Sequence, residues 1–227
     1  MALNRILDDS AREEYADDVQ ALHELCADMI HRKIPRANVQ QAFVFNAVKK
    51  LVPNKDAKIL CAGSFMDTAS VALQRFGYRN IIDIDPVINY SLHEYLMHEF
   101  SDEVSSDEDE TVTSSSREIF DAVFSTSVIE HVENDIEYFD DVISVVKPGG
   151  FVVITFDYKP DWQPGQPVPI SSRRFYTPDS VKAMQQQFKD GGFSVHGGAD
   201  YDGDIDFTWD GIHYAFGTAV FKKKNAS

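Results

Sequence analysis

The chain has 227 residues, 43% of them hydrophobic, and a formal net charge of −16. This excess of acids argues against binding to a nucleic-acid backbone or an anionic membrane, and no run of about eighteen apolar residues predicts a membrane-spanning helix. The N-terminus is too charged for a signal peptide, and the two cysteines, Cys26 and Cys61, have no zinc-ligand spacing. We therefore expect one soluble, cytoplasmic protein without a metal site.

The first 55 residues predict a helical extension that precedes the main domain. Apolar residues recur at spacings of three and four between residues 10 and 50, and Pro35 divides this segment into two helices. Such stripes usually pack against a core, although helices in this place can also cover the mouth of an active site. The sequence leaves both roles open.

An alternation of strands and helices follows from residue 58. Residues 58–62 predict a strand, residues 67–76 a helix that ends at Gly77, and residues 80–84 a second strand. Because residues 87–90 follow Pro86 directly, we expect almost no helix after this second strand. Residues 101–117 are dense in acids and serines and predict a disordered surface insertion, with a phosphorylated or partner-binding segment as the alternative.

The segment 120–156 predicts one buried β-α-β unit. Its helix begins with a cap at Asn134, and Glu137 can reach back in a capping box. The continuously apolar strand after Gly150 is typical of a parallel sheet that is covered on both faces. The residues of the helix that we expect to be buried lie at helical spacing: Ile136, Phe139, Ile143 and Val146.

The last third of the chain predicts a Pro-rich loop, one helix and two closing strands. The helix over residues 178–189 begins after Thr177, a natural N-cap, with Pro178 at its first position. Residues 193–196 and 214–221 predict strands that can form an antiparallel edge.

Polar residues at the ends of the first two strands of the core predict a nucleoside site. Gly63 follows the first strand, where doubly wound sheets bind nucleotides, but the loop lacks the glycine series of dinucleotide sites, and Asp67 would repel a diphosphate. Asp85 can accept hydrogen bonds from the hydroxyls of a ribose, and Asp83 is the second choice for this role. The alternative is that Asp85 is an ordinary acid in a solvated turn before a proline. These features favour a nucleoside cofactor without a diphosphate.

With these motifs in place, the chain resembles the class I S-adenosylmethionine-dependent methyltransferases. The matching segments, in order, are ILCAGS, IIDIDP, FDAVFSTSVIEHV and VKPGGFVVIT. The resemblance implies a Rossmann-like, doubly wound α/β fold over residues 56–224, with a mostly parallel seven-stranded sheet whose last strand is antiparallel. The chain departs from the pattern of the family at Phe65 and Asp67, which replace the usual loop glycines.

The resemblance also implies S-adenosyl-L-methionine as the cofactor. The cofactor contacts that we expect, from the resemblance and from the residues, are Gly63, Ser64, Asp67, Asp83, Asp85, Ser125, Thr126 and Ser127. Candidate catalytic residues are Asp157 and Tyr158, just past the fifth strand, and His131, a base near physiological pH. The alternatives are a structural role for the pair Glu130-His131 and ordinary loop polarity for Asp157 and Tyr158.

The expected activity is methyl transfer to an oxygen or nitrogen atom of a small polar acceptor or a glycan precursor, with no nucleic-acid or membrane partner. The replaced loop glycines and the acidic insertion leave one alternative, a non-catalytic binding or scaffold protein of the same fold. A second alternative, a nicotinamide-dependent oxidoreductase, shares the fold, but the loop lacks the glycine series of such enzymes.

Overall fold

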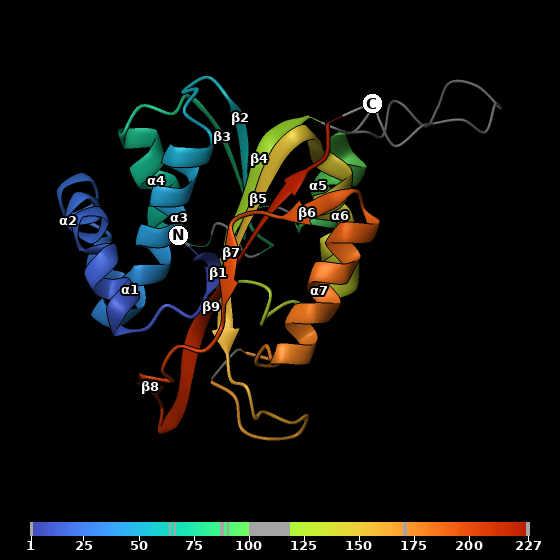
Figure 1. The fold of residues 1–227 in the computed structure, drawn as a ribbon. Coiled ribbons are helices and arrows are strands. Elements are labelled where there is room, and N and C mark those ends of the chain that lie inside the picture. The colour runs from blue at the N-terminus through green and yellow to red at the C-terminus, as the bar shows by residue number, and fades with distance from the viewer. Residues whose placement is uncertain are drawn as a thin grey trace.

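The structure is a computed structural model, and it describes residues 2–63, 65, 67–86, 89, 91–99, 119–169 and 172–225. The acidic insertion predicted over residues 101–117 lies outside the described residues. Among those described, a central sheet stands between two layers of helices (Figure 1). The fold is therefore the α/β arrangement that the sequence predicts.

The sheet contains seven strands in the described part of the chain, in the order β3-β2-β4-β5-β9-β6, and β8 pairs only with β9. Strands β3, β2, β4 and β5 are parallel, and β9 is antiparallel to β5, β6 and β8. This confirms a mostly parallel sheet with an antiparallel last strand. The bounds of the strands are β2 Lys58–Ala62, β3 Asn80–Ile84, β4 Phe120–Thr126, β5 Val146–Tyr158, β6 Phe193–Val195, β8 Phe207–Trp209 and β9 Ile212–Lys223.

Alternation along the strands divides the core into two halves. In β2, Ile59 and Cys61 pack toward one layer of helices, whereas Leu60 and Ala62 pack toward the other. The first layer contains α1 Asp9–Glu14, α2 Ala16–Leu25, α3 Asn38–Leu51 and α4 Thr68–Arg75. The second contains α5 Leu92–Glu99, α6 Asp135–Val145 and α7 Pro178–Asp190.

The N-terminal segment shares the hydrophobic core of the first layer. Leu22 and Phe43, from α2 and α3, are fully buried in the same cluster as strand residues of β2 and β4. A short parallel pair, β1 Ala2–Arg5 with β7 Gly198–Asp200, lies beside β9. Two 3-10 turns, η1 Ile30–Arg32 and η2 Pro35–Ala37, connect α2 to α3.

Two expectations about helices were wrong. A helix, α5, does follow β3, because Ser91 and Glu94 form a capping box: the Glu94 backbone N–H donates to Ser91 Oγ (3.2 Å), and the Ser91 N–H donates to Glu94 Oε2 (2.8 Å). In α6 the buried residues are Phe139, Val142 and Val145. Ile136, in the first turn of that helix, is 63% exposed.

The predicted helix starts were correct. The Asn134 side chain accepts a hydrogen bond from the Glu137 N–H (3.3 Å), and Thr177 forms a capping box with Ser180. A polar side chain at these positions satisfies backbone donors that the helix itself leaves unpaired.

Candidate active site

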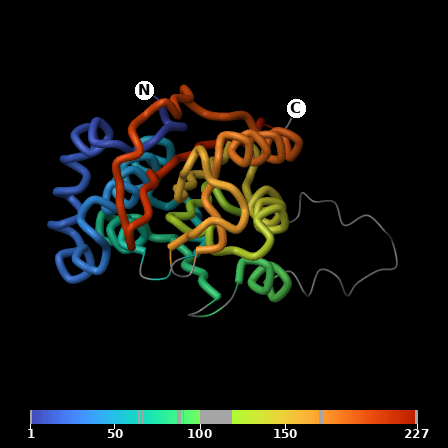
Figure 2. The backbone as a smooth tube through the Cα atoms, turned by 90° about the horizontal axis from the view of Figure 1, so that it is seen from below, coloured from blue at the N-terminus to red at the C-terminus, as the bar shows by residue number. Residues whose placement is uncertain are grey.

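A cavity of about 550 Å³ opens at the carboxyl edge of the parallel strands. It is lined by residues that follow β2, β3 and β4, among them Gly63, Asp85 and Ser127. Figure 2 views the molecule from this end, with the blue N-terminal helices on one side of the strands and α6 and α7 on the other. The volume lies in the range of small-molecule sites, and the carboxyl edge of an open α/β sheet is where such folds bind ligands.

The turn after β2 depends on a glycine for a steric reason. Gly63 has φ +94°, and a Cβ atom at this position would lie 2.4 Å from Val128 Cγ2. The Gly63 N–H donates to the Ile84 carbonyl (2.8 Å), which ties this turn to the end of β3. The side chain of Val128 therefore occupies the space that a side chain at position 63 would need, and Val128 also lines the cavity.

Asp67 stands at the start of α4 and lines the cavity, although it is only 4% exposed. Its carboxylate caps the helix by accepting from the Ser70 N–H (2.7 Å). Burial raises the pKa of Asp67, while the hydrogen bond from the Ser70 N–H and the charge of Lys33 act in the opposite direction. Ser64, the other predicted contact of this loop, lies outside the described residues.

The structure distinguishes the two acids of the predicted ribose motif. Asp85 lines the cavity, is 6% exposed, and accepts from the Phe65 N–H through Oδ2 (3.1 Å). Asp83 does not line it: its carboxylate accepts from the Ser70 hydroxyl and from Gln74 Nε2 (2.9 Å), which attaches α4 to β3. The geometry thus favours Asp85 over Asp83 as a ligand contact.

The three hydroxyl residues at the end of β4 have different surroundings. Thr126 and Ser127 line the cavity, whereas Ser125 is buried beneath it and accepts from the Tyr138 hydroxyl (3.0 Å). Ser127 has a positive φ of 57°, which is uncommon for a residue with a side chain. Its hydroxyl donates to Glu130 Oε1 (2.6 Å) and its N–H to the Thr155 carbonyl (3.0 Å).

His131 lines the cavity, and the turn that carries it is held in place from a distant part of the chain. Arg173 Nε donates to the His131 carbonyl (3.1 Å), and Arg174 donates to the carbonyls of Val132 and Glu133 (both 2.8 Å). The two arginines after the Pro-rich loop therefore hold the turn that carries His131 by hydrogen bonds to its backbone carbonyls.

Asp157 and Tyr158 point to opposite faces of the sheet, as successive strand residues do. Tyr158 packs against Phe156 and Tyr201 in the second half of the core and is 2% exposed. Asp157 is 5% exposed, and burial, with Glu130 as the next contribution, raises its pKa well above the usual range. The structure therefore separates these two candidates, and neither of them is among the residues that line the cavity.

Three further residues of the cavity were not predicted as contacts from the sequence. Lys33 comes from the segment between η1 and η2, and Phe65 presents a ring that is 51% exposed. The hydroxyl of Tyr138, from α6, lies 3.0 Å from both the Ala62 carbonyl oxygen and Ser125 Oγ, within hydrogen-bond distance of each. Only the fold brings these three side chains together, because they are far apart in the chain.

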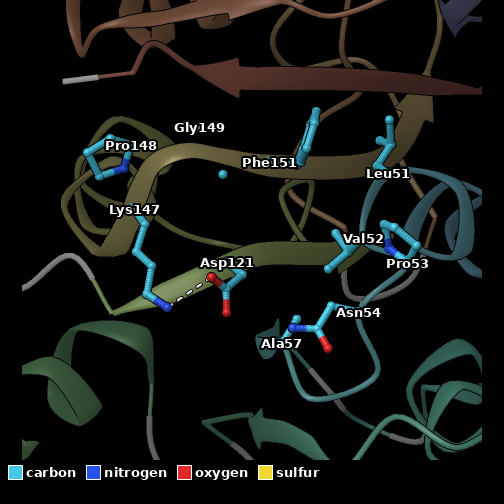
Figure 3. Close-up of a pocket in the computed structure, with 11 residues that line it drawn as sticks. Leu51, Val52, Pro53, Asn54, Ala57, Asp121, Lys147, Pro148, Gly149 and Phe151 are labelled. Carbon is cyan, nitrogen blue, oxygen red and sulfur yellow. Dashed lines mark hydrogen bonds and ion pairs between the residues drawn. The ribbon is translucent and has the colours of Figure 1, made fainter. Parts of the chain in front are cut away.

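A second pocket, of about 300 Å³, lies at the opposite edge of the sheet (Figure 3). Its charged groups are Lys147 and Asp121, which form an ion pair of 2.9 Å. Asp121 also accepts from the Lys58 N–H (2.7 Å). Because these contacts engage both charges, this pocket offers less to a reaction than the cavity at the carboxyl edge.

Two features are absent from the described part of the chain. No group of three or more His, Cys, Asp or Glu side chains there could hold a metal ion. No helix there is long and apolar enough to cross a membrane.

Comparisons with known proteins point to one activity. Residues 68–154 match the family model of a methyltransferase domain. No protein of curated function matches the chain in sequence.

The fold is similar to several solved structures. One is a 1,6-didemethyltoxoflavin-N1-methyltransferase from Burkholderia thailandensis (16% identity, TM-score 0.51, covering 95% of this chain and 89% of that one). A proposed sarcosine dimethylglycine methyltransferase from Galdieria sulphuraria aligns at 13% identity and a TM-score of 0.54, over 92% of this chain and 99% of that one. TehB from Haemophilus influenzae aligns over 80% of this chain at 17% identity and a TM-score of 0.50, and this chain spans 61% of its length.

Proposed function

We propose that this chain, which belongs to the class I S-adenosylmethionine-dependent methyltransferases, transfers a methyl group to a nitrogen or oxygen atom of a small polar acceptor or a glycan precursor. The observation that carries the proposal is Asp85, a buried carboxylate that lines the cavity at the end of β3. A carboxylate in this place can accept the two hydroxyls of a ribose.

The residues around the cavity fit a nucleoside cofactor. Asp85 would hold the ribose, and Gly63 with Thr126 and Ser127 would form the wall beside it. The ring of Phe65, 51% exposed at the cavity, offers an apolar surface next to these polar groups. The bound cofactor supplies a methyl group activated on a sulfonium, so the protein has to position the acceptor in line with that methyl group and to remove a proton.

The nature of the acceptor is supported by the similar structures. The Burkholderia enzyme is named for N1 methylation of 1,6-didemethyltoxoflavin, and the Galdieria protein for sarcosine and dimethylglycine. Both names specify small molecules. A small acceptor also suits a cavity of about 550 Å³ that has to admit the cofactor as well.

Calorimetric titration with S-adenosylmethionine and S-adenosylhomocysteine tests the proposal, with Asp85→Ala and Asp83→Ala as a matched pair. We expect binding by the unmodified chain, at least tenfold weaker binding by Asp85→Ala, and nearly unchanged binding by Asp83→Ala, because Asp83 is engaged by α4. A folded sample that binds neither compound would overturn the proposal. Binding without methyl transfer to any acceptor would favour the non-catalytic alternative.

A further inference from the structure

The cavity at the carboxyl edge has a second polar region besides the predicted ribose contact, and three residues that line it make this region: Lys33, Asp67 and Thr126. Asp67 is the N-cap of α4, and Lys33 lies in the connection between α2 and α3, so both belong to the first layer of helices. Thr126 faces this layer too, because the preceding Ser125 bonds to Tyr138 of α6 in the second layer. The three side chains therefore lie on the same side of the sheet.

Thr126 has a buried hydroxyl without a partner. The residue is only 5% exposed, and its Oγ1 atom forms no hydrogen bond with the described part of the chain. A buried polar atom in this state costs free energy, and in native proteins it commonly marks a place that a water molecule, an ion or a ligand completes. Because Thr126 lines the cavity, a ligand in the cavity can supply the partner.

Lys33 and Asp67 bring opposite charges to this side of the cavity, and no ion pair joins them. Asp67 is 4% exposed; its Oδ1 accepts from the Ser70 N–H (2.7 Å), and a carboxylate can accept further donors through its other oxygen. Lys33 is the only lysine or arginine among the described residues that line the cavity. Its ammonium forms no hydrogen bond or ion pair with the described residues, so it can donate to a ligand.

An α-amino acid group matches these three side chains. Its carboxylate can accept from the ammonium of Lys33 and from the hydroxyl of Thr126, and its ammonium can donate to the carboxylate of Asp67. A phosphate or a simple carboxylate would engage Lys33 but would place a like charge beside Asp67. The region therefore favours a ligand group that carries both charges.

The register of the sheet relates this region to the predicted ribose contact. Continued past the strand ends, the pairing of β2 with β3 and with β4 places Asp85, Gly63 and Thr126 at one level, with Gly63 in the middle. Because neighbouring strands are about 4.8 Å apart, the backbones at Asp85 and Thr126 are separated by about 10 Å. In S-adenosylmethionine, a short chain through the sulfonium joins the ribose to an α-amino acid group. With the ribose on Asp85, this chain can cross Gly63 and reach the three side chains.

We propose that Lys33, Asp67 and Thr126 bind the α-amino acid end of S-adenosylmethionine: Lys33 and Thr126 donate to its carboxylate, and Asp67 accepts from its ammonium. This rests on the proposed function and specifies how the cofactor is held in a chain where Phe65 and Asp67 replace the usual loop glycines. The ammonium favours the ionised form of Asp67. Through Lys33, the N-terminal segment becomes part of the cofactor site in addition to its role in the core.

Titration calorimetry with S-adenosylhomocysteine and methylthioadenosine tests this proposal, because the two compounds share the adenosine part and only the first has an α-amino acid group. We expect the unmodified chain to bind S-adenosylhomocysteine at least tenfold more tightly than methylthioadenosine. Lys33→Met and Asp67→Asn should each weaken S-adenosylhomocysteine at least tenfold, and Thr126→Val at least threefold. None of the three should change the affinity for methylthioadenosine more than twofold. Asp67→Asn keeps the start of α4 intact, because asparagine is also a good N-cap.

Two controls separate this region from the ribose contact and from a general charge effect. Asp85→Ala should weaken both compounds, because both contain the ribose, whereas Lys50→Met removes an exposed charge of α3 outside the cavity and should weaken neither. The proposal fails if S-adenosylhomocysteine binds no more tightly than methylthioadenosine, or if Lys33→Met leaves its affinity unchanged. It fails equally if Lys33→Met and Asp67→Asn weaken both compounds to the same extent. A folded chain that binds neither compound would overturn the proposed function as well.

Discussion

Replacing Gly63 by alanine should destabilise the protein through a contact with Val128. Forcing a side chain into a positive φ costs about 1–3 kcal/mol. The added Cβ atom would also lie 2.4 Å and 2.6 Å from the two γ-carbons of Val128, and overpacking of this kind costs about 1–3 kcal/mol more. Val128 is β-branched and has few rotamers into which it can move. The sum, roughly 2–6 kcal/mol, is a large part of a typical folding free energy of about 5–15 kcal/mol.

Gly77 provides the matched control, because it has φ +108° and a Cβ atom there would have no neighbour within 4 Å. In urea unfolding, Gly77→Ala should lose about 1–3 kcal/mol and Gly63→Ala clearly more. Combining Gly63→Ala with Val128→Ala should recover part of the loss, as a favourable coupling in a double-mutant cycle. If Gly63→Ala were no more destabilised than Gly77→Ala, or if Val128→Ala recovered nothing, the steric explanation of this turn would be refuted.

Three further predictions concern stability. Tyr138→Phe should lower the free energy of unfolding by about 1–3 kcal/mol, because the Ala62 carbonyl and the Ser125 hydroxyl lose their shared hydrogen-bond partner. Urea unfolding, with Tyr95→Phe as the control, measures this loss. Ser91→Ala should lower the free energy of unfolding by about 0.5–2 kcal/mol, because it removes the capping box of α5. An unchanged midpoint of urea unfolding would contradict this. Burial and the charge of Glu130 raise the pKa of Asp157, so the stability that its neutral form supports is fully present below about pH 4 and is lost as the pH rises through the raised pKa. Asp157→Asn should therefore flatten the fall in unfolding free energy above pH 4, and a pH series in which both proteins fall equally would contradict this.

The sequence predicts those parts of the fold whose cause is local. The N-caps at Asn134 and Thr177 could be identified because a short side chain bonds to a backbone group three residues away. The same local logic could have found α5, since Ser91 and Glu94 have the spacing of a capping box.

Strands β1, β7 and β8 could not be predicted, because each has only three or four residues and depends on partners far away in the chain. Asn4 is an example. Its side chain is fully buried, donates to the His196 carbonyl (2.8 Å), and accepts from the Val220 N–H (2.8 Å). Nothing near residue 4 in the sequence indicates these contacts, so the pairing of β1 with β7 becomes visible only in three dimensions.

The candidate site shows the same division. Gly63 and Asp85 follow directly from strand ends, and the structure places both at the cavity. The adjacent residues Asp157 and Tyr158 were treated as one candidate pair, but strand alternation directs them to different halves of the core. An alternation argument alone could have separated them, although it could not have shown that neither of the two lines the cavity.

The position of Lys33 depends on contacts between both ends of the chain. The segment that carries it lies between η1 and η2, and Arg36 in η2 forms ion pairs with Asp9 (2.8 Å) and Asp206 (3.2 Å). Arg12 of α1 pairs with the same two acids. Asp206 directly precedes β8, so this network connects the N-terminal helices to the hairpin of β8 and β9 that carries Tyr214. The N-terminal helices therefore do more than cover the sheet: through this network they are connected to the segment that carries Lys33, which lines the cavity.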